Sequence, residues 1–201
     1  MQYVYGFVSI PLGECLIKTS NMKWKEKTDN DFYDYIDLSS LSIEKHLIQE
    51  TQRINKSNAP SRAQQIVKKN DVLFGATRPM LKRYCIIPQK YDNQICSTGY
   101  CVLRANGMLV NPKWVYYQIS TSNFYEYVEN HQQGASYPGI SDKDIKNYVI
   151  QLPSLDEQNR IIKLLDKFDK LVNDLKDGLP AEIEARKKQY EYYRNKLLSF
   201  E

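Results

Sequence analysis

The sequence predicts an α+β protein in which a mixed globular domain, residues 1–152, is followed by a long, coiled-coil-like helical arm, residues 153–201. The prediction rests on a change of pattern near residue 152. Before it, short strand-like runs alternate with loops rich in Gly, Pro, Asn and Ser, whereas after it the apolar residues recur at helical spacing. With 201 residues, 42% of them hydrophobic, the chain can bury one ordinary core and carry an appendage.

The globular domain is predicted to contain short strands separated by turns. Alternating or β-branched runs predict strands at residues 3–10, 33–38, 66–67, 72–74, 84–87, 100–104 and 148–150. The turn at Lys69-Asn70-Asp71 predicts that the two strands flanking it form a hairpin.

Helices are predicted toward the end of the globular domain. Asn111 followed by Pro112 is an N-cap with proline at the first helical position, which predicts a helix running through Ile119. Ser122 is predicted to cap a second helix, and Ser141 a short helical turn. Strands and helices together indicate a mixed α+β domain.

A capping box opens the helical arm, since Ser154 is followed three residues later by Glu157. The apolar residues beyond it form a narrow seam at spacings of three and four, which suits pairing with another long helix. The seam residues are Ile161, Leu164, Phe168, Leu171, Leu175, Ile183, Tyr190, Tyr193 and Leu197. Gly178 and Pro180 are expected to end, kink or restart the helix between the two halves. The same spacing also fits an amphipathic hairpin that closes its own domain.

Positive charge is concentrated in one stretch of the globular domain. Residues 1–150 carry 18 basic and 14 acidic side chains, while residues 151–201 carry ten of each, so the globular part holds the whole net charge of +4. Between Arg53 and Lys90 there are nine basic residues and one acid, Asp71, a net charge of +8 in 38 residues. Such a run is typical of a face that binds phosphates, although a solvated basic surface has the same composition.

Several functional classes have no support in the sequence. The four cysteines form no C-x-x-C pair and there are two histidines, so we expect reduced thiols and no metal site. Neither a signal peptide nor an apolar run of about eighteen residues is present, which predicts a cytoplasmic protein without a membrane span. No phosphate-binding loop or nucleophile–base pair is evident, so we expect no catalytic residue.

The last fifty residues carry a specific pattern. It reads Leu152-Pro153-x-Leu155-x-x-Gln158-x-x-Ile161, then Gly178-Leu179-Pro180-Ala181-Glu182-Ile183 and Lys188-Gln189-Tyr190-Glu191-Tyr192-Tyr193-Arg194. This pattern closely resembles the conserved spacer region in specificity (S) subunits of type I restriction–modification systems. Residues 134–140 and 145–152 resemble the end of that family's target-recognition domain, so the resemblance covers essentially the whole chain.

The resemblance implies a non-catalytic subunit that reads double-stranded DNA, largely through the major groove, and directs a methyltransferase and restriction complex to a gapped target. The implied partners are double-stranded DNA, methyltransferase (M) subunits docked on the spacer helices and, through them, the restriction (R) subunit. S-adenosylmethionine, Mg and ATP would belong to those partner subunits, so no cofactor is expected in this chain. The implied location is the prokaryotic cytoplasm.

A full specificity subunit of that family has two recognition domains and two helical spacers, and the resemblance here covers one of each. We therefore expect a half-length form that pairs through its C-terminal helices as a homodimer, mimicking the pseudo-twofold of the intact subunit. Such a dimer would read two inverted half-sites. Two alternatives stay open, a stand-alone dimeric DNA-binding regulator and an inactive fragment of a full specificity subunit.

Candidate base-contacting residues lie in three polar loops, residues 58–62, 77–83 and 132–133, and candidate phosphate contacts lie at the turn of Lys68 and Lys69. They are chosen by chemistry, because the family's target loops differ with the sequence recognised. Arginine can fork onto guanine, asparagine or glutamine can pair with adenine, and lysines suit phosphates. The candidates are Asn58, Ser61, Arg62, Lys68, Lys69, Thr77, Arg78, Lys82, Arg83, Gln132 and Gln133. For Arg62 and Arg78 the competing interpretation is a structural ion pair.

Overall fold

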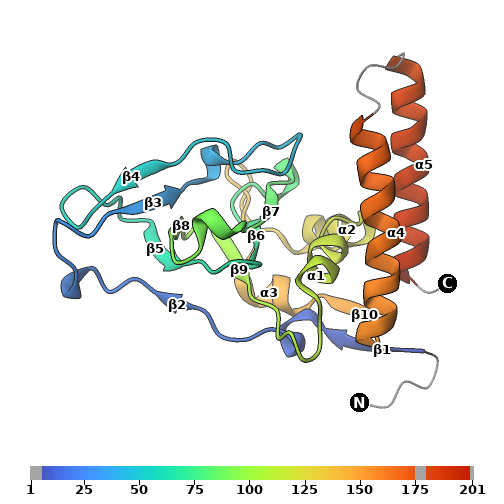
Figure 1. Cartoon of the computed structure of the whole chain (residues 1–201), viewed down its shortest axis with the longest axis horizontal. Helices are drawn as coiled ribbons and strands as arrows, with labels where there is room; N and C mark the ends of the chain where they lie inside the picture. The colour runs from blue at the N-terminus through green and yellow to red at the C-terminus, as the bar shows by residue number, and fades with distance from the viewer. Residues whose placement is uncertain (1–5, 175–179, 200–201) are drawn as a thin grey trace.

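The computed structural model describes residues 6–174 and 180–199, with the side chains of residues 171–183 outside the description. These residues form an elongated molecule with a β-rich end, a helical middle and a two-helix hairpin (Figure 1). The strands are β1 (Phe7–Pro11), β2 (Ser20–Asn21), β3 (Tyr33–Ile36), β4 (Gln52–Ile54), β5 (Ala63–Ile66), β6 (Val72–Gly75), β7 (Tyr84–Ile86), β8 (Ile95–Ser97), β9 (Tyr100–Leu103) and β10 (Val149–Pro153). The helices are α1 (Pro112–Gln118), α2 (Ser122–His131), α3 (Asp142–Asn147), α4 (Leu155–Asp174) and α5 (Pro180–Ser199). The predicted α+β class with C-terminal helices is confirmed.

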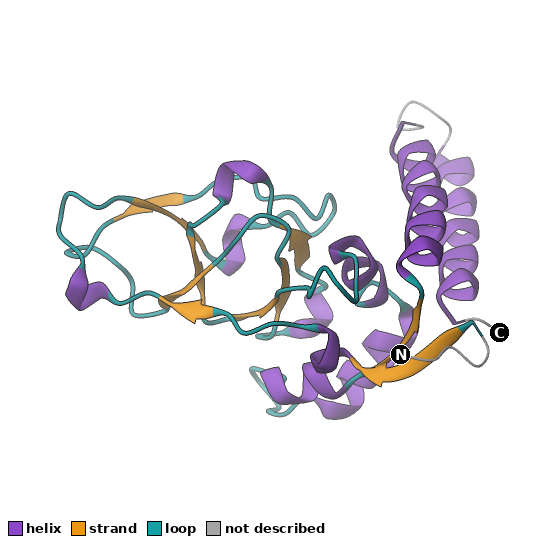
Figure 2. Cartoon of the chain, turned by 60° about the horizontal axis from the view of Figure 1, so that its bottom comes forward, coloured by secondary structure: helices purple, strands orange, loops and turns teal. Residues whose placement is uncertain are grey.

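The described strands form three small sheets. β1 and β10 pair antiparallel, with Val8 opposite Leu152, and so bring the two ends of the globular part together. A five-stranded sheet has the order β2-β5-β8-β3-β4, in which only the β3–β8 pair is parallel. A three-stranded sheet has the order β7-β6-β9. The β1–β10 ribbon lies at the base of the helical hairpin, and the five-stranded sheet lies at the far end of the molecule (Figure 2).

One predicted hairpin is wrong. The strands that flank Lys69-Asn70-Asp71 belong to different sheets, because β5 pairs with β2 and β8 whereas β6 pairs with β7 and β9. The turn between them is held by Asp71, which is 1% exposed and accepts hydrogen bonds from Arg104 at 2.7 and 2.8 Å. Arg104 also donates to the Ile66 carbonyl oxygen at 3.1 Å. This buried ion pair therefore joins the end of β5 to the turn that precedes β6.

The short helices begin where their predicted caps lie, with one shift. The Asn111 side chain accepts a backbone N–H in the first turn of α1, and Ser141 does the same for α3, as the sequence predicts. The predicted cap at Ser122 is wrong by one residue, because the Thr121 hydroxyl accepts the first-turn N–H of α2. Ser122 is instead the first helical residue.

The C-terminal arm is a helical hairpin. α4 and α5 lie side by side and run in opposite directions, so α5 returns the chain toward the globular part (Figure 1). At the start of α4, Ser154 accepts the Glu157 N–H at 3.3 Å, and the Glu157 carboxylate accepts two hydrogen bonds from Arg160. α5 begins at Pro180, where proline suits a first helical turn, while the predicted break at Gly178 lies outside the described residues. The hairpin alternative is therefore the observed arrangement.

One hydrophobic core joins the hairpin to the globular part. It contains the fully buried Trp114 of α1 and Phe124 of α2, and it takes in Ile161 and Leu165 from α4 and Leu198 from α5. The predicted boundary at residues 152 and 153 falls within β10, and this core extends across it. Packed side chains on both helices therefore set the orientation of the hairpin on the globular part.

Candidate nucleic-acid interface

Three of the predicted loops are joined by backbone hydrogen bonds into one surface. The turn after β8 connects the loop that carries Arg62 with the loop that carries Thr77. The Thr98 N–H donates to the Arg62 carbonyl oxygen at 2.9 Å, and the Gly99 carbonyl oxygen accepts from the Thr77 N–H at 3.3 Å. The third loop joins through the Arg78 N–H, which donates to the Pro138 carbonyl oxygen at 2.7 Å. We name the exposed and half-buried side chains of these loops the loop surface: Ser61, Arg62, Thr77, Arg78, Thr98, Gln133 and Tyr137.

Arg78 is held in an unusual conformation on the loop surface. Its backbone is left-handed, with φ 49°, and Pro79 follows it. A non-glycine residue there carries backbone strain of roughly 1 kcal/mol or more. The hydrogen bond to Pro138 and the position of the guanidinium 4.1 Å from the centre of the Tyr137 ring compensate this strain. The arrangement presents an exposed arginine and an exposed aromatic ring side by side.

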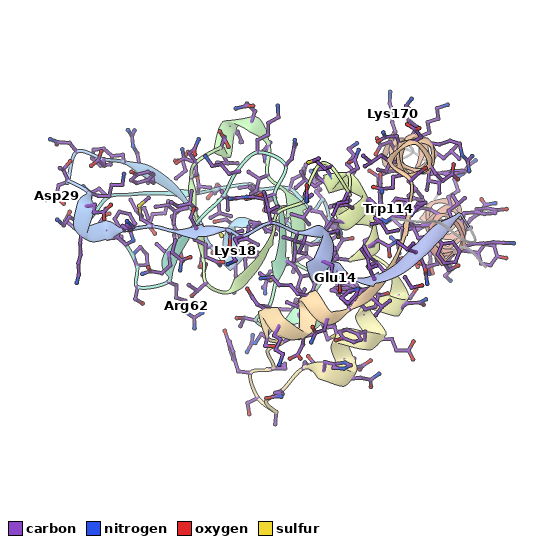
Figure 3. The ribbon with its side chains drawn as sticks, turned by 90° about the horizontal axis from the view of Figure 1, so that it is seen from below. Glu14, Lys18, Asp29, Arg62, Trp114 and Lys170 are labelled. Atoms are coloured by element: carbon purple, nitrogen blue, oxygen red, sulfur yellow. The ribbon has the colours of Figure 1, made fainter. Side chains whose placement is uncertain are left out.

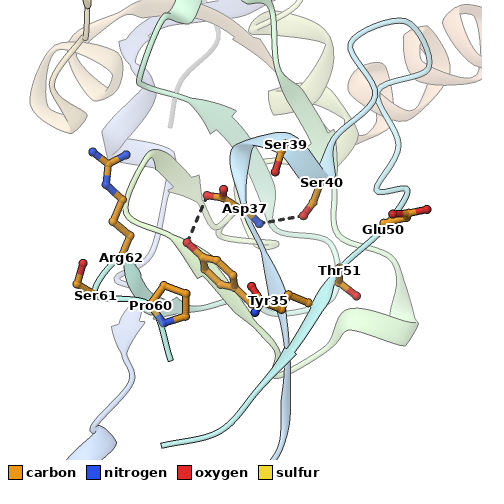
Figure 4. Close-up of a pocket in the computed structure, with 10 residues that line it drawn as sticks. Tyr35, Asp37, Ser39, Ser40, Glu50, Thr51, Pro60, Ser61 and Arg62 are labelled. Carbon is orange, nitrogen blue, oxygen red and sulfur yellow. Dashed lines mark hydrogen bonds between the residues drawn. The ribbon is translucent and has the colours of Figure 1, made fainter. Parts of the chain in front are cut away.

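A polar groove of about 640 Å³ adjoins Arg62 (Figure 4). Arg62 lies on one side and Glu50 on the other, with Tyr35 and Asp37 between them. The Tyr35 hydroxyl donates to the Asp37 carboxylate at 3.3 Å, and the Asp37 N–H donates to the Ser40 hydroxyl at 3.1 Å. Within residues 6–174 and 180–199, neither the Arg62 guanidinium nor the Glu50 carboxylate has a hydrogen-bond or ion-pair partner. The structural ion pair considered for Arg62 is therefore not formed with any described residue.

The groove and the helical hairpin lie in different parts of the molecule. Arg62 projects from the edge of the β-rich part, whereas Lys170 marks α4 on the opposite side of the view (Figure 3). A ligand bound at Arg62 therefore leaves the hairpin accessible to other partners.

Two predicted lysines lie apart from the loop surface. Lys68 and Lys69 are exposed in the turn before β6, whereas Thr77 and Arg78 follow β6, so the strand separates the two pairs. The Lys68 ammonium group contacts the Asn93 side chain, which places the lysines beside a second turn. The basic run of the sequence is therefore divided between two ends of the three-stranded sheet.

Four other candidates have surroundings of their own. Lys82 lies over the Tyr125 ring at 4.8 Å, and the carbonyl oxygen of Arg83 accepts a backbone N–H at the end of β6. Asn58 uses its side-chain oxygen to accept a backbone N–H within its own loop at 2.7 Å. Gln132 is half-buried, and its side-chain oxygen has no hydrogen-bond partner among the described atoms. The structure therefore gathers only part of the predicted set.

The predicted seam residues have three kinds of surroundings. Ile161 is buried, Leu164, Tyr190 and Leu197 are half-buried, Phe168 and Tyr193 are exposed, and Leu171, Leu175 and Ile183 lie outside the described side chains. Ile162 and Leu165 of α4 are also buried, although neither belongs to the predicted seam, because α4 packs on the globular core as well as on α5. Phe168 and Tyr193 stack across the two helices with ring centres 6.2 Å apart.

A polar cleft of about 350 Å³ lies between the hairpin and the globular part. Within it the His46 ring stacks on Tyr84 with ring centres 3.9 Å apart, and Arg194 of α5 lines the same cleft. The pKa of His46 is lowered to about 4, mainly by burial and to a smaller extent by the nearby positive charge of Arg194. Burial raises the pKa of Tyr84 to about 12. Both rings are therefore uncharged at neutral pH.

Three residues of the candidate interface were not predicted from the sequence: Glu50, Thr98 and Tyr137. Glu50 and Thr98 reach it only through the arrangement of β3, β4 and β8, and no local pattern marks either of them. Tyr137 had a usable signal, because it is an aromatic residue in the same Gly-punctuated loop as Gln133.

Among the described residues, no helix has the length and apolar character needed to cross a membrane. The same residues contain no cluster of three or more His, Cys, Asp or Glu side chains suited to a metal ion.

The sequence and the fold of the chain match a known protein family. The family profile of the type I restriction modification DNA specificity domain matches residues 10–185, and the protein belongs to this family. The specificity subunit of the type I restriction enzyme EcoR124I/EcoR124II from Escherichia coli is 42% identical over 88 residues, 44% of this chain and 22% of that protein. A putative type I specificity subunit of Mycoplasma pneumoniae is 46% identical over 66 residues, 33% of this chain and 28% of that protein.

Solved structures show the same relationship. The HsdS subunit from Thermoanaerobacter tengcongensis superposes with a TM-score of 0.76 at 31% sequence identity, covering 88% of this chain and 45% of that chain. A type I S subunit from M. genitalium shares the fold, with a TM-score of 0.54 at 16% identity. The chain therefore spans less than half the length of these relatives, and the resemblance found in the sequence is confirmed at the level of the family.

Proposed function

We propose that this chain is a DNA-recognition module of a type I restriction–modification complex and reads one half of a gapped, bipartite target. The observation that carries the proposal is the loop surface, where backbone hydrogen bonds hold exposed arginines and polar side chains from three loops on one edge of the β-rich part. Arg62 and Arg78 are the base-reading candidates on this surface. Lys68 and Lys69 lie apart from it and suit phosphate contacts, which position a protein without specifying a sequence.

The hairpin is the proposed docking site for methyltransferase subunits, which in turn bring the restriction subunit. Residues 1–152 then form the recognition domain and residues 153–201 the spacer. Catalysis, S-adenosylmethionine, Mg and ATP belong to the partner subunits in this proposal. The docking proposal is supported by the continuous core that contains Trp114 of α1 and Leu198 of α5. A packed core fixes the position of the globular part relative to a partner that binds the hairpin.

The second half of the target is proposed to be read by a second copy of the chain. Phe168 and Tyr193 support this proposal, since they form a stacked aromatic pair that remains 36% and 41% exposed on the hairpin. A two-fold pair of chains joined at this surface would read two identical, inverted half-sites.

The test is to express the chain with its methyltransferase subunit and to map methylated adenines across the host genome. A gapped palindrome is expected. An asymmetric gapped motif would show that the chain acts beside a different recognition domain. No new methylation, with the chain folded and bound to the methyltransferase subunit, would contradict the recognition role and favour a regulator or an inactive fragment.

The same mapping is repeated with the double substitution Arg62→Ala and Arg78→Ala in the chain. This substitution is expected to abolish or broaden the motif while the chain still co-purifies with the methyltransferase subunit, because both arginines are exposed on the loop surface. Loss of co-purification would instead show that the substitutions damage the fold or that the loops contact the partner.

A further inference from the structure

Arg78 and Tyr137 are brought together from two loops that lie far apart in the sequence. The Arg78 guanidinium lies over the Tyr137 ring, 4.1 Å from the ring centre, which is within the range of a cation–π contact. Both side chains are exposed, Tyr137 to 61%. The cation and the ring therefore stay at the surface after they have paired, where a ligand can reach them.

Backbone hydrogen bonds hold the loop of Tyr137 beside Arg78. The Arg78 N–H donates to the Pro138 carbonyl oxygen at 2.7 Å, so the residue after Tyr137 is joined directly to Arg78. The same loop is closed at its base, because Gln133 and Gly139 exchange two backbone hydrogen bonds of 2.7 and 2.9 Å. These contacts place the ring next to the arginine without help from a ligand.

The backbone of Arg78 is itself held in one conformation. Its φ of 49° lies in the left-handed region, which a residue with a Cβ adopts only where the surrounding structure imposes it. Pro79, which follows, is buried and begins a short 3₁₀ turn. The chain is therefore fixed on both sides of Arg78, and only rotation of the side chain remains for the Tyr137 ring to restrict.

The donors of the Arg78 guanidinium remain available while it lies on the ring. Within residues 6–174 and 180–199, this guanidinium has no hydrogen-bond or ion-pair partner. A cation–π contact is an attraction between the charge and the ring face, so it needs no acceptor for the guanidinium N–H groups. An arginine held in this way loses less conformational entropy on binding than one that rotates freely.

We propose that Tyr137 is a positioning residue for DNA recognition, which holds the Arg78 guanidinium in place for its contact with a base. This inference rests on the proposed function and adds a residue that sets specificity on the loop surface. Tyr137 acts through Arg78, because its ring restricts the arginine side chain before DNA binds. Its effect is therefore confined to the base pair that Arg78 reads.

A second tyrosine on the same segment shows what a structural role looks like. Lys82 lies over the Tyr125 ring at 4.8 Å, but Tyr125 is 5% exposed and belongs to the main hydrophobic core. Burial in the core accounts for Tyr125 without any ligand. Tyr137 is 61% exposed and gains little from burial, so its contact with Arg78 is the interaction that its position serves.

The test uses the purified complex of the chain with its methyltransferase subunit and duplexes carrying the motif found by methylation mapping. Each base pair of the half-site is changed in turn, and the loss of affinity is measured at one fixed salt concentration. Arg78→Ala identifies the base pair that Arg78 reads, because discrimination is lost there. Tyr137→Leu keeps an apolar side chain without a ring face, and it is expected to reduce discrimination at that pair roughly 2- to 5-fold. Tyr137→Phe keeps the ring face and is expected to retain the discrimination.

Two controls separate positioning from a general effect on the chain. Ser136→Ala changes an exposed residue of the same loop and is expected to leave discrimination at every base pair unchanged. Tyr137→Leu combined with Arg78→Ala is expected to cause no further loss at the Arg78 pair, because the tyrosine acts through the arginine side chain. Damage to the fold lowers the affinity for all duplexes equally, so it does not reproduce a loss at one base pair.

The outcomes separate the two proposals. A complex that binds no duplex specifically would overturn the recognition role and the positioning role together. Specific binding in which Arg78→Ala affects no base pair, or in which Tyr137→Leu leaves discrimination at the Arg78 pair unchanged, would overturn the positioning role alone. The positioning role is equally refuted if Tyr137→Phe loses as much as Tyr137→Leu, or if Tyr137→Leu causes the same loss when Arg78 is already replaced.

Discussion

Gln158 in α4 accepts the Asn111 N–H at 2.8 Å and thereby ties the spacer helix to the N-cap of α1. The Gln158 amide nitrogen donates to the carbonyl oxygens of Leu109 at 3.1 Å and Pro153 at 2.9 Å. The side chain is fully buried, and both its oxygen and its nitrogen are paired. The glutamine of the spacer pattern is therefore a structural connector between the hairpin and the recognition part.

Replacing Gln158 by Leu is expected to destabilise the chain by about 2–4 kcal/mol, because it removes three hydrogen bonds, two of them half-buried and the one to Pro153 buried. The measurement is the free energy of unfolding from urea titration. Asn159→Ala is the control, since Asn159 is exposed and contributes one hydrogen bond to the Asn111 side chain. A loss for Gln158→Leu no larger than that of the control would show that the connection carries little energy.

The buried ion pair of Asp71 and Arg104 gives the second stability prediction. Asp71→Ala is expected to cost about 3–5 kcal/mol, because it leaves the mostly buried Arg104 guanidinium without its anionic partner. The exposed pair of Lys23 and Glu26 is the control, and Glu26→Ala is expected to cost at most about 1 kcal/mol. Urea unfolding of both variants checks the difference, and equal losses would contradict it.

The local elements were predictable because their signals lie in adjacent residues. Asn111 and Ser141 cap their helices as predicted, since a side-chain acceptor two or three residues before a free N–H is a short-range interaction. The wrong hairpin around Asn70 shows the limit. Its strands pair with distant strands in two different sheets, and the turn between them is held by Arg104, 33 residues from Asp71. No local pattern in the sequence predicts such contacts.

The sequence predicted the types of residue in the candidate interface, but not which of them would come together there. Arg62 and Arg78 were predicted from their charge and their loops. Glu50 was missed because a single acid gives no signal in the sequence, and only strand pairing places it in the same groove as Arg62.

The prediction of the seam had a different limit. A spacing of three and four residues describes equally well a helix packed on its own hairpin and a helix packed on a second chain, so Phe168 could not be assigned from its period.

Stability below neutral pH is expected to depend on His46. Its pKa is about 4 in the folded chain, compared with the ordinary value of 6.5 for an exposed histidine in the unfolded chain. The folded state therefore favours the neutral ring. The stability that this shift contributes is fully present above pH 6.5 and is lost as pH falls toward 4. The groups responsible are the burying side chains, then Arg194 and Lys82.

The pH prediction is checked by urea unfolding at pH 7.5, 5.5 and 4.5. The variant His46→Gln keeps a neutral polar side chain and is expected to lose less stability between the first and last pH than the original chain, because it has no proton to take up. Carboxylates titrate equally in both proteins, so the difference between them isolates His46. Parallel curves would rule out the assignment.

The dimer proposal makes the last prediction. The double substitution Phe168→Glu and Tyr193→Glu places two charges on the exposed aromatic pair, which is expected to prevent two hairpins from packing at this surface. Sedimentation at micromolar concentration is expected to show a dimer for the original chain and a monomer for the variant. Met108→Glu is the control, because Met108 is 85% exposed and lies in a loop outside the hairpin. A monomeric original chain would refute the homodimer, and a variant that still dimerises would place the contact elsewhere on the molecule.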